Sequence, residues 1–87
     1  MKLSILSIDK KIDYEIAWLE INTPDGNFII QDNHIETIFS LSPQKEITFK
    51  LTSSEEIESF FIHEFSVLEV TNKNEALLVL GDKCQES

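Results

Sequence analysis

The chain has 87 residues, which is enough for one domain with one compact core. Sixteen acidic residues face seven lysines, with no arginine, for a formal net charge of -9. This charge repels phosphate backbones and anionic lipid surfaces, so it argues against nucleic-acid binding. A basic protein partner would be attracted instead.

The sequence also indicates a cellular location. No segment approaches the ~20 apolar residues of a membrane span, so direct membrane insertion is not expected. The N-terminus does not resemble a signal peptide. The one cysteine, Cys84, lies in a polar tail and has no internal partner for a disulfide, which favours a reducing compartment. We therefore expect a cytoplasmic protein.

The first two segments alternate with a period of two, as strands do. Residues 2–8 place Leu3 and Ile5 on one side. Residues 12–22 predict a long strand whose apolar face changes along its length, as in a strand that serves two sheets or crosses a bulge. One face would carry Tyr14, Ile16 and Trp18, and the other Ala17, Leu19 and Ile21.

Strong turn chemistry follows the long strand. Pro24 presets one turn position and Gly26 accepts a positive φ, so residues 24–26 predict a turn. Residues 28–30 then predict a short buried strand, and residues 35–41 a further strand that ends at the turn 42–45. In that strand the inward positions are expected to be Ile35, Thr37, Phe39 and Leu41.

The clearest alternation in the chain is in residues 46–52, with Ile47, Phe49 and Leu51 inward. Residues 53–56 fit either a helix start with a capping box or a turn before a strand. The neighbouring segments are strands at hairpin spacing, which favours the turn and a strand over 57–62. A last hairpin joins residues 65–71 to 75–80, because the asparagines of its turn, 72 and 74, tolerate the left-handed conformation.

These elements add up to about eight short strands with frequent turns and no expected helix. The pattern predicts an all-β fold, a flattened sandwich or barrel. We expect one domain over residues 1–82 and a polar tail over residues 83–87.

Residues that could carry chemistry are few. The two histidines, His34 and His63, are too far apart in sequence to indicate a zinc site, and we expect no metal or cofactor. The acidic cluster of Glu55, Glu56 and Glu58 is typical of a solvated turn, whereas a hydrolase needs two carboxylates held across a cleft. Because no phosphate loop or nucleophile elbow is present, we do not expect an enzyme.

Two surfaces remain as candidates for protein contact. Trp18, with Tyr14 on its expected face, fits an interface residue or a core residue equally well. The polar loop at residues 31–34, with Asp32, Asn33 and His34, is a candidate contact loop.

Two motifs in register resemble the N-terminal β-sandwich domain of the epsilon subunit of F-type ATP synthases, called delta in mitochondria. Residues 23–28 (Thr-Pro-Asp-Gly-Asn-Phe) match the family's Thr-Pro-Asp-Gly-Glu-Phe turn. Residues 63–70 (His-Glu-Phe-Ser-Val-Leu-Glu-Val) lie where the family has Gly-Gly-Phe-Leu-Glu-Val and resemble it in part. The likeness covers roughly residues 1–82.

The chain also departs from the family pattern. Residues 32–35 (Asp-Asn-His-Ile) stand where the family has Pro-Gly-His-Ala, and His63-Glu64 stand where it has Gly-Gly. The family usually continues into a two-helix domain that restrains ATP hydrolysis and in some members binds ATP. Neither property is carried over to this chain.

The resemblance implies a non-catalytic subunit of the central stalk that docks on the gamma subunit and the c-ring and couples proton transport to ATP synthesis. It would lie on the inner face of the membrane through the synthase complex. The c-ring contact carried over is His34, with its neighbours Asp32 and Asn33. The alternatives are a diverged stand-alone β-sandwich that binds another protein or forms a homodimer when isolated, and an enzyme built on the acidic cluster.

Overall fold

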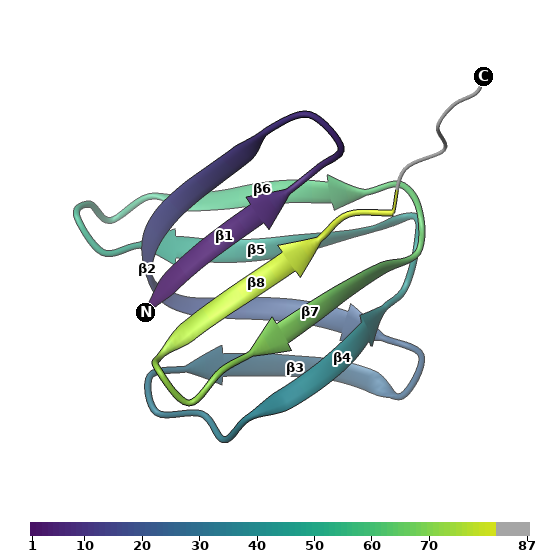
Figure 1. The fold of residues 1–87 in the computed structure, drawn as a ribbon. Helices are drawn as coiled ribbons and strands as arrows, with labels where there is room; N and C mark the ends of the chain where they lie inside the picture. Colours follow the sequence, from purple (N-terminus) through teal and green to yellow (C-terminus); the bar gives the residue numbers. More distant parts are fainter. Residues whose placement is uncertain (82–87) are drawn as a thin grey trace.

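The computed structural model describes residues 1–81, which form eight strands and no helix (Figure 1). The all-β prediction is confirmed. The predicted boundary at residue 82 and the tail with Cys84 lie outside the described residues. The strands are β1 (Lys2–Leu6), β2 (Lys11–Thr23), β3 (Gly26–Gln31), β4 (Thr37–Leu41), β5 (Lys45–Leu51), β6 (Ile57–Ile62), β7 (Ser66–Val70) and β8 (Glu75–Val79).

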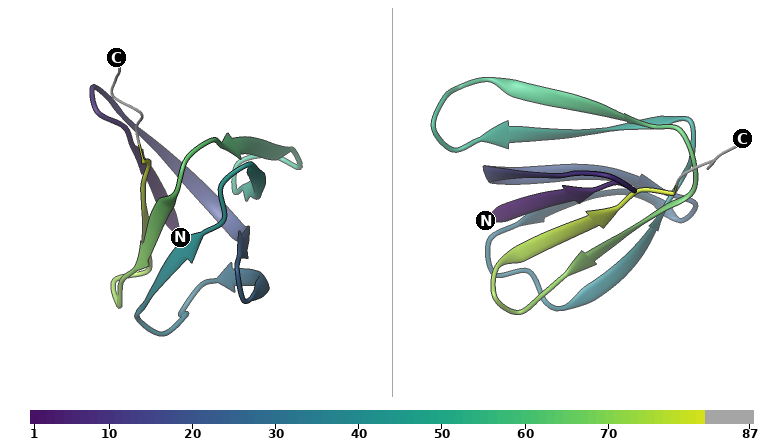
Figure 2. Two further views of the ribbon diagram at one scale, coloured as in Figure 1. Left: turned by 90° about the vertical axis from the view of Figure 1, so that its right-hand side faces the viewer. Right: turned by 45° about the horizontal axis from the view of Figure 1, so that its top comes forward.

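The strands form one strongly curled sheet that folds over on itself (Figures 1 and 2). Their order is β4-β7-β8-β1-β2-β5-β6, and β3 pairs with the second half of β2. Neighbours are antiparallel, except that β1 and β8 run parallel. Residues 1–81 thus enclose a core between two layers, one around β1, β7 and β8 and the other around β3, β5 and β6.

The long strand β2 belongs to both layers, as its changing apolar face predicts. Its first half pairs with β1, and its second half pairs with β3 and β5. The register with β5 shifts between Ile16 and Trp18, which marks a β-bulge. A bulge adds one residue and so moves every later side chain to the opposite face.

This bulge corrects one part of the predicted pattern. Ile16 pairs with Leu51 and faces the core, whereas Trp18 pairs with Lys50 and faces outward. Leu19 therefore takes the inward position after the bulge and is fully buried. Trp18 does not share a face with Ile16.

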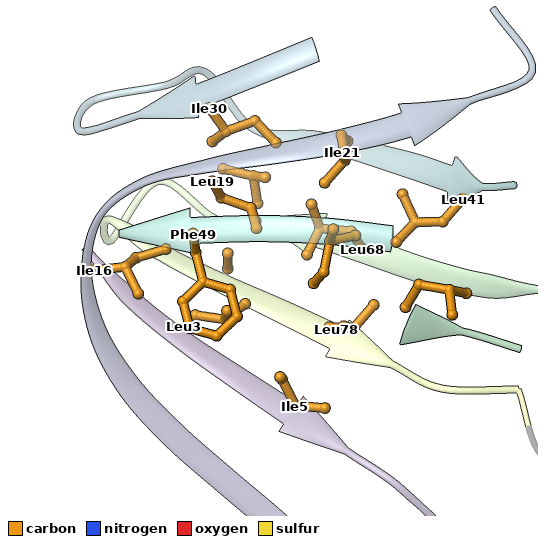
Figure 3. Packing of buried hydrophobic residues seen from close by; sticks show 14 residues of the cluster. Leu3, Ile5, Ile16, Leu19, Ile21, Ile30, Leu41, Phe49, Leu68 and Leu78 are labelled. Carbon is orange, nitrogen blue, oxygen red and sulfur yellow. The ribbon is translucent and has the colours of Figure 1, made fainter. Parts of the chain in front are cut away.

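The core consists of aliphatic side chains from both layers with a single phenylalanine, and it lies between them (Figure 3). β-branched and leucine side chains dominate because they pack well on pleated surfaces. The buried set is Leu3, Ile5, Ile16, Leu19, Ile21, Ile30, Leu41, Ile47, Phe49, Ile62, Leu68, Val70, Ala76 and Leu78.

The turns form largely where the sequence predicts them. The β2–β3 turn is fastened by the Thr23 hydroxyl, which accepts a hydrogen bond from the Asp25 amide and donates one to the Gly26 carbonyl, both at 3.0 Å. Asn74 adopts the expected left-handed conformation with φ 62°. Residues 52–56 form a turn before β6, so the turn-then-strand prediction is confirmed.

The predicted strand over residues 35–41 is too long at its start. β4 begins at Thr37, and Ile35 lies in the preceding loop with 77% of its side chain exposed. Its predicted inward position is therefore wrong, because the strand alternation does not extend to this residue.

Candidate functional site

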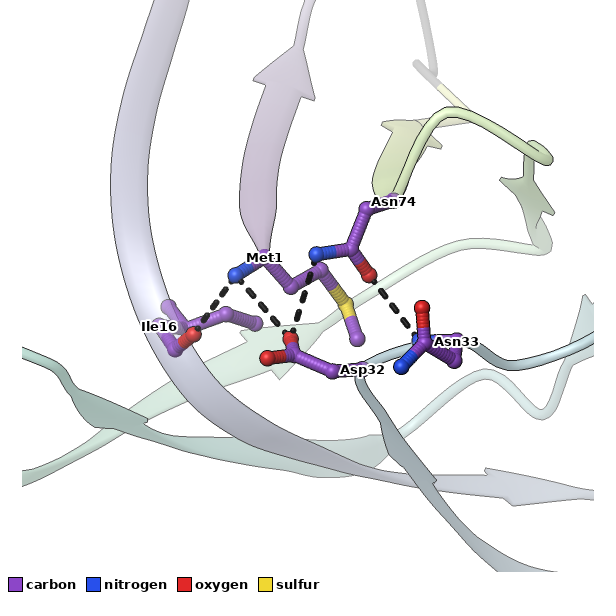
Figure 4. Close-up of polar contacts among 5 residues, drawn as sticks. All are labelled: Met1, Ile16, Asp32, Asn33 and Asn74. Atoms are coloured by element: carbon purple, nitrogen blue, oxygen red, sulfur yellow. Dashed lines mark hydrogen bonds and ion pairs between the residues drawn. The ribbon is translucent and has the colours of Figure 1, made fainter.

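The predicted contact loop joins β3 to β4 and lies beside the β7–β8 turn and the N-terminus (Figure 4). Asp32 Oδ1 accepts from the Met1 ammonium at 3.2 Å and from Asn74 Nδ2 at 3.3 Å. The Asn33 amide donates to Asn74 Oδ1 at 3.1 Å. The Met1 ammonium also donates to the Ile16 carbonyl at 3.2 Å. Asp32 and Asn33 thus fasten the loop to two other parts of the chain.

These contacts also determine the charge of the loop. The hydrogen bond from the Met1 ammonium, followed by that from Asn74, lowers the pKa of Asp32 below its ordinary value. Since the partners favour the ionised carboxylate, Asp32 is negatively charged at neutral pH. Its side chain is still 59% exposed, so water and an approaching partner can reach it.

His34 is half-buried next to this network. Its Nδ1 lies 2.8 Å from the Ile35 carbonyl, and its ring lies 6.1 Å from that of Phe39. Two isoleucines near it, Ile35 and Ile38, expose most of their side chains. The accessible part of this region is therefore partly apolar. The exposure of Ile35 was not predicted, because this residue was given an inward strand position, whereas Ile38 lies on the outer face of β4 as the alternation predicts.

The other predicted interface residues do not join the loop in one cluster. The Tyr14 ring packs 4.9 Å from the ring of Phe49, a core residue, so Tyr14 contributes mainly to internal packing. Trp18 faces outward from the second layer, between Gln31 of β3 and Lys50 of β5. It borders the contact loop only through Gln31, the residue that precedes Asp32.

The acidic cluster does not form a pair of facing carboxylates. Glu55 lies in the exposed β5–β6 turn, where Lys50 Nζ approaches its Oε1 at 3.7 Å and also donates to the Ser54 carbonyl at 3.1 Å. Glu58 pairs with the buried Phe49 and lies on the inner face of β6. Glu55 and Glu58 therefore lie on different faces, so this cluster does not hold these two carboxylates across one cleft.

The histidines are similarly separated. His34 follows β3 and His63 follows β6, and these two loops lie at opposite ends of the molecule (Figure 1). In residues 1–81 no three His, Cys, Asp or Glu side chains are grouped to hold a metal ion. The same residues contain no helix with the length and hydropathy that a membrane crossing requires.

A pocket of about 400 Å³ opens at the end of β6. The sequence pattern did not indicate it, because its walls come from three separate parts of the chain. The lining includes Gln44, Phe60, Phe61, His63, Leu80 and Gly81.

Solved structures share this fold. The chain is similar to a chain in the central stalk and c-ring of the Tetrahymena thermophila mitochondrial ATP synthase, with a TM-score of 0.78 and 15% identity. It is also similar to a chain in the OSCP, F1 and c-ring structure of the Euglena gracilis mitochondrial ATP synthase, with a TM-score of 0.79 and 15% identity.

Both likenesses cover nearly all of this chain but only part of each matched chain. They cover 94% and 92% of this chain but only 63% and 49% of the matched chains. The chain thus spans less than two thirds of the proteins it resembles. No protein-family model and no curated protein sequence matches it.

Proposed function

We propose that this protein is a non-catalytic central-stalk subunit of an F-type ATP synthase. The observation that carries the proposal is the TM-score of 0.79 over 92% of the chain to a chain of such a synthase. The sequence adds independent support, because residues 23–28 and 63–70 resemble epsilon-subunit motifs in the same order. In this role the subunit does no chemistry and couples proton transport to ATP synthesis.

The proposed partners are the gamma subunit and the c-ring. The end of the domain that carries the β3–β4 loop would meet the c-ring, with His34 and its neighbours at the contact. Asp32 and Asn33 support this role by holding the loop to Met1 and Asn74, because a fixed loop loses less conformational entropy on binding. The net charge of -9 favours basic surfaces on either partner.

The location follows from the partners. The protein would be cytoplasmic and peripheral, held at the inner face of the membrane by the rest of the synthase. No cofactor, metal or nucleic acid takes part in this function.

Photo-crosslinking tests the orientation. In the assembled synthase, His34→p-benzoylphenylalanine is expected to crosslink to the c subunit. Asp9→p-benzoylphenylalanine is the matched control, because Asp9 lies in the β1–β2 turn and not at the loop end. A crosslink to the c subunit from position 9 and none from position 34 would contradict the proposed orientation.

A second function remains as an alternative: a stand-alone interaction module. It is favoured by apolar side chains that are exposed on both layers, such as Ile38 on β4 and Ile57 on β6. Such a protein would bind a partner outside the synthase. Binding of the purified chain to the gamma subunit of its own host, measured by gel filtration of the mixture, separates the two functions.

A further inference from the structure

The strand β6 forms an open edge of the curled sheet. The sheet order ends at β6, which among residues 1–81 pairs only with β5. In the tilted view of Figure 2 it makes the upper rim, with no strand beyond it. The strands β3 and β4 also have a single partner each, but they approach one another where the rings of Phe28 and Phe39 lie 5.4 Å apart.

Hydrogen bonds at the two ends of the β5–β6 pair show which backbone groups of β6 point toward β5. The carbonyl of Ile62 accepts from the Gln44 amide at 2.7 Å, and the carbonyl of Glu56 accepts from the Leu51 amide at 3.3 Å. Successive residues of a strand direct their N–H and C=O groups to opposite sides. The backbone groups of the even-numbered residues thus point toward β5. Those of Ile57, Ser59 and Phe61 point to the open edge.

The side chains of these same residues lie on the outer face. Ile57 is 58% exposed and Phe61 is 39% exposed, with the exposed Ser59 between them. Proteins often protect an open edge with proline, lysine or a bulge, and residues 57–62 have none of these. The one charge, Glu58, lies on the inner face; an inward charge is itself one means of edge protection, but it leaves the outer face of β6 uncharged.

We propose that β6 pairs antiparallel with β6 of a second copy of this chain, with the two-fold axis at Ser59. In this register Ile57 of each copy faces Phe61 of the other, and the two Ser59 residues face each other. Each facing pair can exchange both of its hydrogen bonds, because all of these residues point their backbone groups to the open edge.

The side chains fit this register. The exposed isoleucine of each copy covers the exposed phenylalanine of the other on one continuous face, and aromatic with β-branched pairs stabilise facing strands. The small serines meet at the axis. On the inner face Glu58 lies opposite Phe60 of the second copy, so the acids of the two copies are not directly opposed.

A second copy is favoured over an unrelated peptide because the edge is complementary to itself about Ser59. The pairing concerns the isolated chain and is independent of the proposed function. It also predicts a salt effect: each copy carries a charge of -9, so salt that screens the repulsion should strengthen the dimer.

Analytical ultracentrifugation of the full chain tests the pairing, from about 1 µM to about 1 mM and at about 0.05 and about 0.5 M NaCl. We expect the mass to approach twice that of the monomer as concentration rises, at lower concentration in high salt. A chain that stays monomeric throughout would overturn the inference.

A charge exchange at the axis tests the register. Ser59→Lys and Ser59→Glu should each weaken self-association by about tenfold or more, because like charges would face each other. An equimolar mixture of the two should restore a dimer. Ser40→Lys, on the exposed face of β4, is the matched control and should associate like the wild type.

Circular dichroism at each concentration confirms that every variant is folded, which is expected because Ser59 is exposed. Association of Ser59→Lys equal to the wild type, or a mixture that does not restore the dimer, would contradict the two-fold axis at this residue.

Discussion

Asn74 joins the candidate contact loop to the β7–β8 turn and has two separable roles. Its side chain accepts from the Asn33 amide at 3.1 Å and donates to Asp32 at 3.3 Å. Its backbone is left-handed, with φ 62°. Asn74→Gly removes the side chain and keeps the backbone free to adopt this φ, whereas Asn74→Ala removes the side chain and makes this φ unfavourable.

The expected losses of unfolding free energy differ accordingly. Both hydrogen bonds are accessible to solvent, so each contributes about 0.5 kcal/mol, at the low end of the usual range. Glycine adds about 0.5 kcal/mol through the entropy of the unfolded chain. Alanine instead adds about 1.5 kcal/mol for the left-handed backbone. We expect losses of about 1.5 kcal/mol for Asn74→Gly and about 2.5 kcal/mol for Asn74→Ala.

Urea unfolding followed by the fluorescence of Trp18, the single tryptophan, measures both values. In thermal unfolding the difference between the variants corresponds to about 4–8 °C. Asn72→Ala is the matched control in the same turn and should change the free energy by less than about 0.5 kcal/mol. Equal losses for Asn74→Ala and Asn74→Gly would refute the assigned role of the backbone conformation.

Three further predictions concern packing and pH. A Cβ at Gly81 would overlap the Phe65 carbonyl oxygen, so Gly81→Ala should lower the melting temperature by about 4–8 °C or more in calorimetry. Leu68→Ala, at a fully buried position, should cost about 2–5 kcal/mol in urea unfolding, and a loss below about 1 kcal/mol would contradict the packing. A hydrogen bond from Ser4 lowers the pKa of Asp13, so this carboxylate stabilises the fold above about pH 4, and the contribution is lost as pH falls through the lowered pKa. The stability difference between wild type and Ser4→Ala should therefore shrink in acid, and a constant difference between about pH 7 and about pH 2 would exclude this linkage.

Local patterns were sufficient for most of the strands. The alternation of residues 46–52 predicted β5 and its inward Ile47 and Phe49, because one buried face imposes a period of two. The change of face in residues 12–22 predicted a strand shared by two layers. It did not locate the bulge, so Trp18 was assigned to the wrong face, since a single inserted residue reverses every later position.

The candidate site was harder to predict because its contacts are distant in sequence. Asn33 and Asp32 meet Asn74 across 41 and 42 residues, and no local pattern encodes such a pairing. The parallel pairing of β1 with β8 likewise joins the first and last strands, which lie far apart in the sequence. The open edge of β6 likewise depends on strand order, which the alternation of residues 57–62 does not contain.

Affinity purification of the tagged protein from its native host, with mass spectrometry of the co-purifying proteins, tests the central claim most directly. A stalk subunit should recover gamma together with the alpha and beta subunits of the synthase. The tag belongs at the C-terminus, because the Met1 ammonium contacts Asp32. Recovery of unrelated proteins, or of none, from a lysate in which the synthase is intact would contradict the proposed function.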